Sequence, residues 1–262
     1  MPSVSTATPD EPTQPLLVIE GRIATISLRK PAFSNRLSPA DLAVLRTHIE
    51  AVNQAEDVLV LRLVSDGKYF CSGYDISSLA SDSAPSSLHF GETVDLLENA
   101  RAVTIAAVQG GAYGGGTDLC LACDFRIGTP QANMFMPAAR LGLHFYPGGM
   151  RRYLSRLGVN AAKRLFLTAE RIEADEMLRI GFLTELVAPD ELYARVDALS
   201  QLLAGMAPLA LLGIKQDLNR LIAGTFDEAD NARAVLHSEA SEDMREGAQA
   251  WKEKRAPQFC GK

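Results

Sequence analysis

The chain has 262 residues, of which 47% are hydrophobic and 22% are charged, and its formal net charge is −6. This composition is typical of a globular protein with a sizeable core, and the acidic balance without a basic block argues against a nucleic-acid-binding surface. No apolar stretch approaches the roughly 20 residues of a membrane-spanning helix, so we expect no membrane segment.

Residues 1–14 are rich in Ser, Thr, Pro and acidic side chains, which predicts a disordered lead-in and not a secretory signal. The cysteines show no disulfide pattern, and without an export signal we expect reduced thiols and a cytoplasmic protein. They are Cys71, Cys120, Cys123 and Cys260. The C-x-x-C of Cys120 and Cys123 has no second Cys pair or nearby His, so we expect core thiols and no metal site.

Strand-like and helix-like segments then alternate along the chain. Strands are predicted at residues 16–19, 23–28, 58–64, 103–108, 125–128, 134–136 and 183–187. Helices are predicted at residues 38–53, 88–101, 117–123 and 147–157. The first of these helices has Ser38 as N-cap, Pro39 at its first position and Asp41 in its first turn. The alternation predicts an α/β fold with parallel strands joined by right-handed crossovers.

The last quarter of the chain reads as helical. Three amphipathic helices are predicted at residues 192–206, 209–222 and 226–237, and each has an apolar stripe to bury against the core or a neighbouring subunit. We therefore expect a lead-in at 1–14, an α/β core at 15–188 and a C-terminal helical region at 189–262. A Ser- and Asp-rich stretch at 77–87 is predicted to be mobile.

Two glycine-containing turns are the most informative feature of the sequence. The first spans residues 70–76 and the second spans residues 110–119, and each follows a predicted buried strand. Two such turns side by side can aim two backbone N–H groups at one point, which forms an oxyanion hole for an enolate or a tetrahedral intermediate. A phosphate-binding loop is the rival interpretation, and it fails because no Lys-Ser or Lys-Thr pair follows.

Polar residues near the second turn leave alternatives open. Asp118 lies in the first turn of the following helix, where it is either a surface acid that complements the helix dipole or a general acid or base. His89 and His144 lie near the motifs, whereas His48 and His237 fall in predicted helices. For all four histidines we favour a structural or solvated role.

Taken together, the ordered segments resemble the crotonase family, also called the enoyl-CoA hydratase/isomerase superfamily, over about residues 16–262. The segments are 31–37, 70–76, 108–119, 141–149, 174–187 and 241–255. The resemblance implies a crotonase-like ββα superhelix, or spiral, with a C-terminal helical region that contributes to trimers or dimers of trimers. It also implies an acyl-CoA thioester as substrate, with no metal or redox cofactor.

The same resemblance assigns roles by position. Tyr74 and Gly115 would donate their backbone N–H groups to the thioester oxygen, which places them with Asp118 and Tyr146 in the catalytic set. The residues expected at the coenzyme A arm are Arg29, Lys30, Phe33, Ser72, Gly73, Asp75 and Ile76. Lys254 and Arg255 lie in the segment that resembles the family's closing helix. They are further candidates to bind the phosphates of coenzyme A.

Three departures from the family pattern bear on function. Hydratases of the family place one glutamate at the position of Asp118 and a second at the position of Ala138, so here one acid is shortened and the other is lost. Some relatives place an acid at the position of Tyr146, whose phenol, with an ordinary pKa of about 10, is a poor base at neutral pH.

Three functions follow from this pattern. The first is an enoyl-CoA hydratase/isomerase-like enzyme of fatty acid metabolism, a lyase or isomerase in which Asp118 is the sole carboxylate and Tyr146 or His144 assists. The second is a non-catalytic or slow acyl-CoA-binding protein, and the third is a thioester hydrolase. Because the loss of one acid or base can cost about 10²–10⁴ in rate, we do not expect an ordinary fast hydratase.

Overall fold

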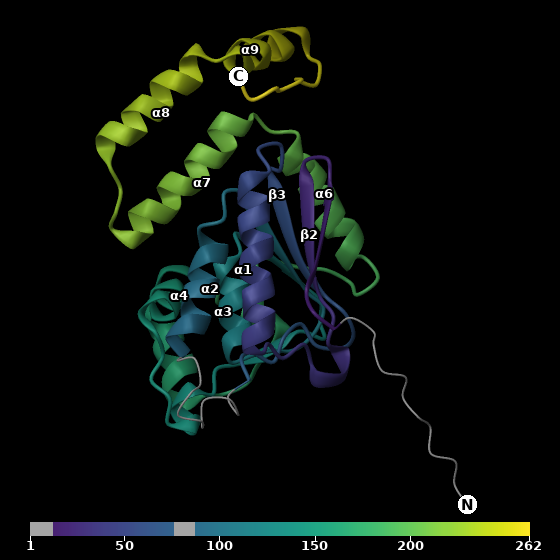
Figure 1. Ribbon diagram of the computed structural model, residues 1–262, viewed down its shortest axis with the longest axis vertical. Helices are drawn as coiled ribbons and strands as arrows, with labels where there is room; N and C mark the ends of the chain where they lie inside the picture. The colour runs from purple at the N-terminus through teal and green to yellow at the C-terminus, as the bar shows by residue number, and fades with distance from the viewer. Residues whose placement is uncertain (1–12, 76–86) are drawn as a thin grey trace, which may run out of the picture.

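A computed structural model of the chain describes residues 13–75 and 87–262 and shows an α/β body that carries a helical arm (Figure 1). The larger sheet has the order β1-β2-β3-β4-β6-β9, in which β1 and β2 pair antiparallel and the other neighbours pair parallel. Its strands are β1 (Leu16–Glu20), β2 (Ile23–Leu28), β3 (Val60–Ser65), β4 (Val103–Val108), β6 (Phe125–Gly128) and β9 (Glu185–Leu186). The predicted α/β class is confirmed.

A smaller sheet lies next to the two glycine turns. It has the order β5-β7-β8 and is formed by β5 (Ala112–Tyr113), β7 (Asn133–Phe135) and β8 (Ile172–Glu173). Its first and last strands were not predicted, because two residues are too few to show an alternating pattern.

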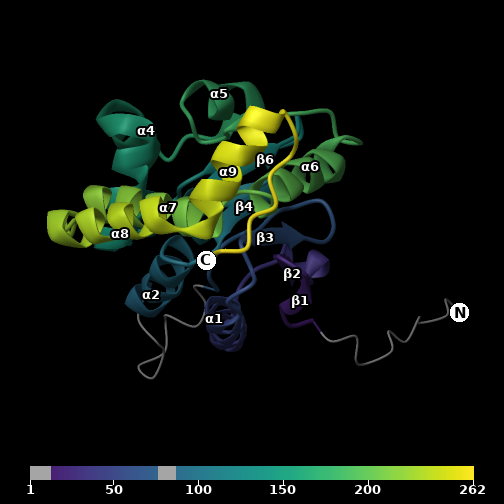
Figure 2. The same ribbon diagram turned by 90° about the horizontal axis from the view of Figure 1, so that it is seen from above.

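Helices cover both faces of the larger sheet (Figure 2). One face packs against α1 (Pro39–Gln54), α2 (Ser87–Glu98), α3 (Gly115–Ala122) and α4 (Pro147–Thr168), and the other packs against α6 (Leu192–Ala204). All six residues of β4 are buried, as expected for a strand covered on both sides. The shorter helices are η1 (Pro31–Phe33), η3 (Ala138–Leu141) and α5 (Ala174–Arg179).

The start of α1 confirms its predicted cap. The Ser38 hydroxyl accepts a hydrogen bond from the backbone of Asp41, and the Asp41 carboxylate accepts one from the backbone of Ser38, which forms a capping box. Helix α4 differs from its predicted end at residue 157. At Gly158 a φ of 76° interrupts the helical geometry, and helical turns then resume as far as Thr168.

The C-terminal helical region divides into two parts. Helix α6 belongs to the body, whereas α7 (Pro208–Ala223), α8 (Glu228–Ala240) and α9 (Glu242–Glu253) form the arm at one end of the molecule (Figure 1). The buried Lys215 ties α7 to the body, because its Nζ contacts a carboxylate oxygen of Asp124 at 2.9 Å and the carbonyl of Ala102 at 2.5 Å. Arg22 donates to the carbonyls of Ala204 and Phe259.

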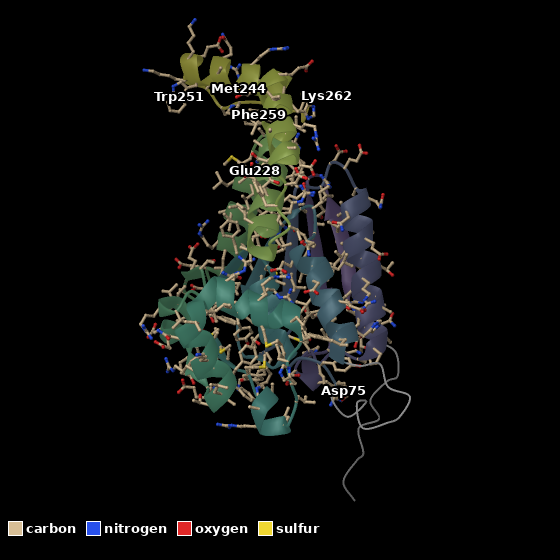
Figure 3. The ribbon with its side chains drawn as sticks, turned by 90° about the vertical axis from the view of Figure 1, so that its left-hand side faces the viewer. Asp75, Glu228, Met244, Trp251, Phe259 and Lys262 are labelled. Atoms are coloured by element: carbon tan, nitrogen blue, oxygen red, sulfur yellow. The ribbon has the colours of Figure 1, made fainter. Side chains whose placement is uncertain are left out.

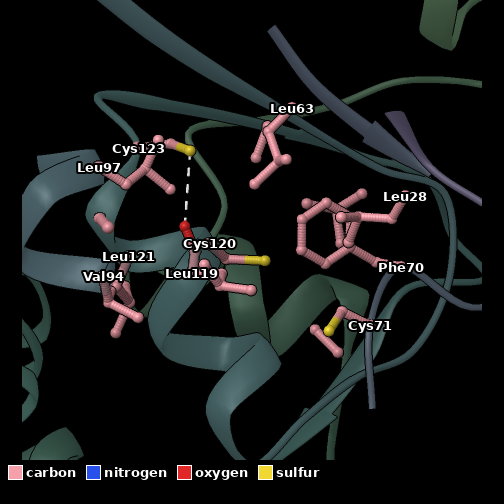
Figure 4. Packing of buried hydrophobic residues seen from close by; sticks show 14 of the residues in the cluster. Leu28, Leu63, Phe70, Cys71, Val94, Leu97, Leu119, Cys120, Leu121 and Cys123 are labelled. Atoms are coloured by element: carbon pink, nitrogen blue, oxygen red, sulfur yellow. Dashed lines mark hydrogen bonds between the residues drawn. The ribbon is translucent and has the colours of Figure 1, made fainter. Parts of the chain in front are cut away.

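Within the described ranges, no helix on its own has the length and apolarity of a bilayer span; α6 and α7 meet that criterion only as a pair bent by 109°. The predicted core thiols are confirmed, since Cys120 and Cys123 are buried among leucines such as Leu97 and Leu121 (Figure 4). Burial raises the pKa of Cys123 to about 12, so this thiol is neutral at physiological pH. The predicted lead-in and the loop at 77–87 fall almost wholly outside the described residues.

Candidate functional site

The structure brings the two predicted turns together. The amide of Phe70 donates to the carbonyl of Gly111 at 3.0 Å, and the amide of Tyr113 donates to the carbonyl of Cys71 at 2.9 Å. Cys71 and Ala112 thereby form a parallel β-bridge. This backbone pairing fixes the position of one turn relative to the other.

Glycine is required where the turns touch. Gly73 has a φ of 90°, and a Cβ atom at this position would lie 2.7 Å from the amide nitrogen of Gly115 and 2.8 Å from the carbonyl oxygen of Tyr113. At Gly116 a Cβ atom would lie 2.2 Å from the carbonyl oxygen of Cys71. The two backbones are therefore in direct contact at the start of α3, and any side chain there would force them apart.

The amides of Tyr74 and Gly115 are the predicted donors at this contact. Leu37 pairs with the backbone on both sides of Tyr74, since its amide donates to Gly73 and its carbonyl accepts from Asp75. In a parallel bridge of this kind the N–H of Tyr74 itself points away from Leu37. Gly115 is the first residue of α3, and no hydrogen bond from its amide is found within residues 13–75 and 87–262.

A mainly apolar cavity of about 90 Å³ lies beside the turns. It is lined by Tyr74, Phe90, Gly114, Met136, Pro137, Ala138, Leu141, Leu143, His144, Phe145 and Tyr146. Phe90, Met136 and Tyr146 of this lining also belong to the buried hydrophobic core. Ala138, at the position of the missing second acid, presents only a methyl group to the cavity.

Asp118 is fully buried, which excludes the interpretation of a surface acid. Arg152 binds both carboxylate oxygens, with Nε at 2.8 Å from Oδ1 and Nη2 at 2.7 Å from Oδ2. The Tyr146 hydroxyl also donates to Oδ2, at 2.5 Å. Three donors therefore fix the carboxylate, and Tyr146, which lines the cavity, separates it from the space where a ligand would sit.

Arg152 was not predicted as a site residue, yet it is the centre of a buried charge network. Its Nη1 also donates to Asp95 at 2.6 Å and to Glu98 at 2.9 Å, and Arg151 donates to the same oxygen of Glu98. Burial alone would lower the pKa of Arg152, but the charges of Asp118 and Glu98 and the hydrogen bonds to Asp118 and Asp95 together raise that pKa, so the guanidinium stays protonated.

Small residues allow this network to close. A Cβ atom at Gly148 would lie 2.2 Å from a carboxylate oxygen of Asp95, and one at Gly91 would lie 2.7 Å from the ring of Tyr146. Burial raises the pKa of Tyr146 well above its ordinary value, and the negative charge of Asp118 adds to this effect. The phenol is therefore neutral, and its proton is committed to Asp118.

The predicted coenzyme A cations already have partners inside the chain. Both carboxylate oxygens of the buried Asp41 accept hydrogen bonds from Lys30 Nζ, at 2.8 and 2.6 Å. Arg29 donates to the carbonyl of Gln14. Phe33 in the same loop is 61% exposed, so it remains open to a ligand.

The remaining residues expected at the coenzyme A arm are placed only in part. Ser72, Gly73 and Asp75 lie in the first turn, whereas Ile76 lies outside the described residues. The predicted cations of the closing segment are distant from this turn, because α9 lies at the end of the molecule opposite Asp75 (Figure 3). Arg255 pairs there with Glu246 and Glu253, so within one chain it does not reach the site.

Comparisons with known proteins agree with this architecture. A family model described as enoyl-CoA hydratase/isomerase matches residues 18–262. The chain is 32% identical to a crotonyl-CoA hydratase of Syntrophomonas wolfei, over 94% of this chain and 98% of that one. It is 31% identical to a short-chain-enoyl-CoA hydratase of Clostridium acetobutylicum, over 92% and 95%.

Solved structures show the same fold. The crystal structure of an enoyl-CoA hydratase/isomerase family protein from Hyphomonas neptunium matches with a TM-score of 0.88 and 27% identity, over 95% of this chain and 98% of that one. An enoyl-CoA hydratase from Bacillus anthracis matches with a TM-score of 0.84 and 28% identity, over 95% and 100%. The predicted crotonase-like fold is thereby confirmed.

The contact between the turns can be tested through two glycines that both have positive φ. We expect Gly21→Ala, whose Cβ would meet no atom within 4 Å, to cost only the backbone strain of about 1–2 kcal/mol. Gly73→Ala should cost about 1–3 kcal/mol more, because its Cβ would strike the backbone of the second turn. Urea unfolding measures both variants, and equal losses would contradict the contact.

Proposed function

The chain belongs to the enoyl-CoA hydratase/isomerase family, and we propose that it processes acyl-CoA thioesters by stabilising an enolate between the backbone amides of Tyr74 and Gly115. The observation that carries this proposal is the forced contact of the two glycine turns beside an apolar cavity. A thioester oxygen held there would receive two N–H donors at the start of α3, where the helix dipole also favours negative charge.

Asp118 is the sole retained carboxylate of the proposed catalytic set, and Tyr146 links it to the cavity. Ala138 has only a methyl group, so it supplies no second acid at its position in the cavity wall. A single carboxylate held by three donors suits a proton shift, a slow hydration of an activated enoyl thioester, or a C–C cleavage. These reactions need the oxyanion hole more than they need a strong base.

The coenzyme A arm would run along the first turn and the loop that contains η1. Phe33 offers an exposed ring, and Ser72 and Asp75 line the turn. The cations Arg29 and Lys30 would have to exchange their present partners for phosphate oxygens, which makes Lys30 the weaker candidate because its partner Asp41 is buried. Coenzyme A enters here as part of the substrate, and no separate cofactor is proposed.

A second candidate function is acyl-CoA binding without turnover. Its specific support is the pairing of Asp118 with Arg152, which occupies both carboxylate oxygens, together with the loss of an acid at Ala138. Both functions require the oxyanion contact and the cavity, and they differ only in whether a product forms.

Mass spectrometry of the purified protein incubated with a panel of enoyl-CoA and 3-oxoacyl-CoA thioesters tests the proposal. We expect a new acyl-CoA product from at least one thioester. Binding of a thioester without any product would support the second function instead, and release of free coenzyme A, followed with a thiol reagent, would indicate hydrolysis. Failure of every thioester to bind would refute both leading functions.

Asp118→Asn tests the carboxylate. Because the variant keeps the shape of the side chain but loses its charge, we expect turnover to fall by about 10²–10⁴ while acyl-CoA binding is retained. Asp175→Asn, on the exposed surface of α5, is the matched control and should keep full turnover. Steady-state kinetics of a folded Asp118→Asn protein decide the role, and unchanged turnover would remove it.

We further propose that the arm assembles the protein into a trimer or a dimer of trimers. Large apolar side chains are exposed along it, including Leu218 and Leu221 on α7, Leu236 on α8 and Trp251 on α9. Several large apolar side chains exposed on one part of a molecule are typical of an interaction surface.

Leu218→Asp should therefore shift the assembly towards monomers in analytical ultracentrifugation, because a charge would be buried in the interface. Gln216→Asp introduces the same side chain at another exposed position of α7 and should leave the assembly intact. A wild-type protein that sediments as a monomer at micromolar concentration would contradict the proposed oligomer.

A further inference from the structure

The peptide between Gly114 and Gly115 carries one of the two proposed oxyanion donors, and its carbonyl end is held by Thr117. The Gly114 carbonyl accepts a hydrogen bond from the Thr117 hydroxyl at 2.5 Å and one from the Thr117 amide at 3.1 Å. The C=O and N–H groups of a trans peptide point in opposite directions. A partner that fixes the Gly114 carbonyl therefore also fixes the direction of the Gly115 N–H, which points away from Thr117.

This peptide needs such a partner, because glycine on both sides leaves it free to rotate. Gly114 has a φ of 52° and a ψ of −122°, the geometry of the first central residue of a type II′ turn. Rotation of the next peptide alone leads towards a type I′ turn, in which its C=O and N–H have exchanged directions. The amide of Gly114 is already bound to the carbonyl of Phe135 at 3.1 Å, so only the orientation of the following peptide remains to be set.

The Thr117 hydroxyl is in turn oriented by Tyr153. Their two oxygen atoms lie 2.5 Å apart, and both side chains are fully buried. A carbonyl can only accept, so Thr117 spends its single proton on Gly114, and the Tyr153 hydroxyl must donate to Thr117. Burial raises the pKa of Tyr153 well above its ordinary value, which keeps that proton in place. A hydroxyl relay thus runs from Tyr153 through Thr117 to Gly114.

We propose that Thr117 and Tyr153 are positioning residues that keep the Gly115 N–H directed at the thioester oxygen. The inference rests on the proposed function, since it concerns one donor of the proposed oxyanion hole. Neither residue is among those that line the cavity, so both act only through the peptide between Gly114 and Gly115.

The test uses butyryl-CoA labelled with ¹³C at its thioester carbonyl, because infrared spectroscopy of the bound ligand reports how strongly that carbonyl is polarised. We expect the C=O band to lie at lower frequency on the wild-type protein than in buffer. A double variant with Thr117→Val and Tyr153→Phe removes both hydroxyls of the relay and leaves neither one buried without its partner. Its band should move back towards the frequency in buffer, whereas Thr117→Ser, which keeps a hydroxyl, should retain the wild-type band.

Steady-state kinetics with a thioester that is turned over gives a second readout. The double variant should lower kcat about tenfold, the value of one orienting hydrogen bond, and should leave KM nearly unchanged. Loss of an oxyanion donor itself typically costs more, about 10²–10³ in kcat. Thr117→Ser should restore kcat.

Thr93→Val is the matched control. Thr93 is also a buried threonine, and its hydroxyl accepts from Arg46 and donates to the carbonyl of His89, within α2. The control therefore removes the same chemical group from the same kind of arrangement without touching the second turn. It should keep the wild-type band and the wild-type kcat.

Circular dichroism shows whether the double variant folds; if it does not, Tyr153→Phe alone should move the band in the same direction by a smaller amount. A lowered wild-type band that stays in place in the folded relay variants would overturn this inference and leave the proposed function standing. An equal shift in Thr93→Val would also overturn it, because any lost buried hydroxyl would then suffice. A wild-type band at the frequency in buffer, or failure of butyryl-CoA to bind, would instead overturn the proposed oxyanion hole itself.

Discussion

The buried ion pair between Arg152 and Asp118 is the interaction on which this site depends. It joins α3 to α4, and through Asp95 and Glu98 it also joins both to α2. Removing one partner of such a pair typically costs about 3–5 kcal/mol, because the other charge is left uncompensated. The cavity wall therefore takes its shape from an electrostatic requirement as much as from apolar packing.

The pair also changes what kind of chemistry the site supports. A carboxylate that faces its ligand can take a proton directly, whereas Asp118 reaches the cavity only through Tyr146. The proposed oxyanion hole does not depend on this ion pair, because it would consist of backbone groups whose positions follow from the pairing of Cys71 with Ala112. In this proposal the fold of the two turns places the two N–H donors, whereas a few side chains would supply the acid or base.

The sequence predicted the parts of the structure that depend on local patterns. The strands with clear hydrophobic runs, the cap at Ser38 and the two glycine turns all lie where they were expected, because their signals are contained in a few adjacent residues. The short strands β5 and β8 were missed because two residues show no periodicity.

Arg152 was missed for a different reason. Its partner Asp118 lies 34 positions earlier, and only the close packing of α3 and α4 brings the two together. A weak signal was present, since Gly148, Gly149, Arg152 and Tyr153 are spaced as one buried face of a helix. That spacing placed a cation among core positions, where a charge needs a partner, but it did not say which carboxylate would provide it.

The arm has a consequence for how this protein can be observed. Trp251 is the single tryptophan of the chain and is 88% exposed on α9, at the end of the molecule opposite Asp75 (Figure 3). Its intrinsic fluorescence therefore reports on the solvation of the arm and is insensitive to events in the distant cavity. A blue shift of this emission on raising the protein concentration would record self-association, separately from ligand occupancy.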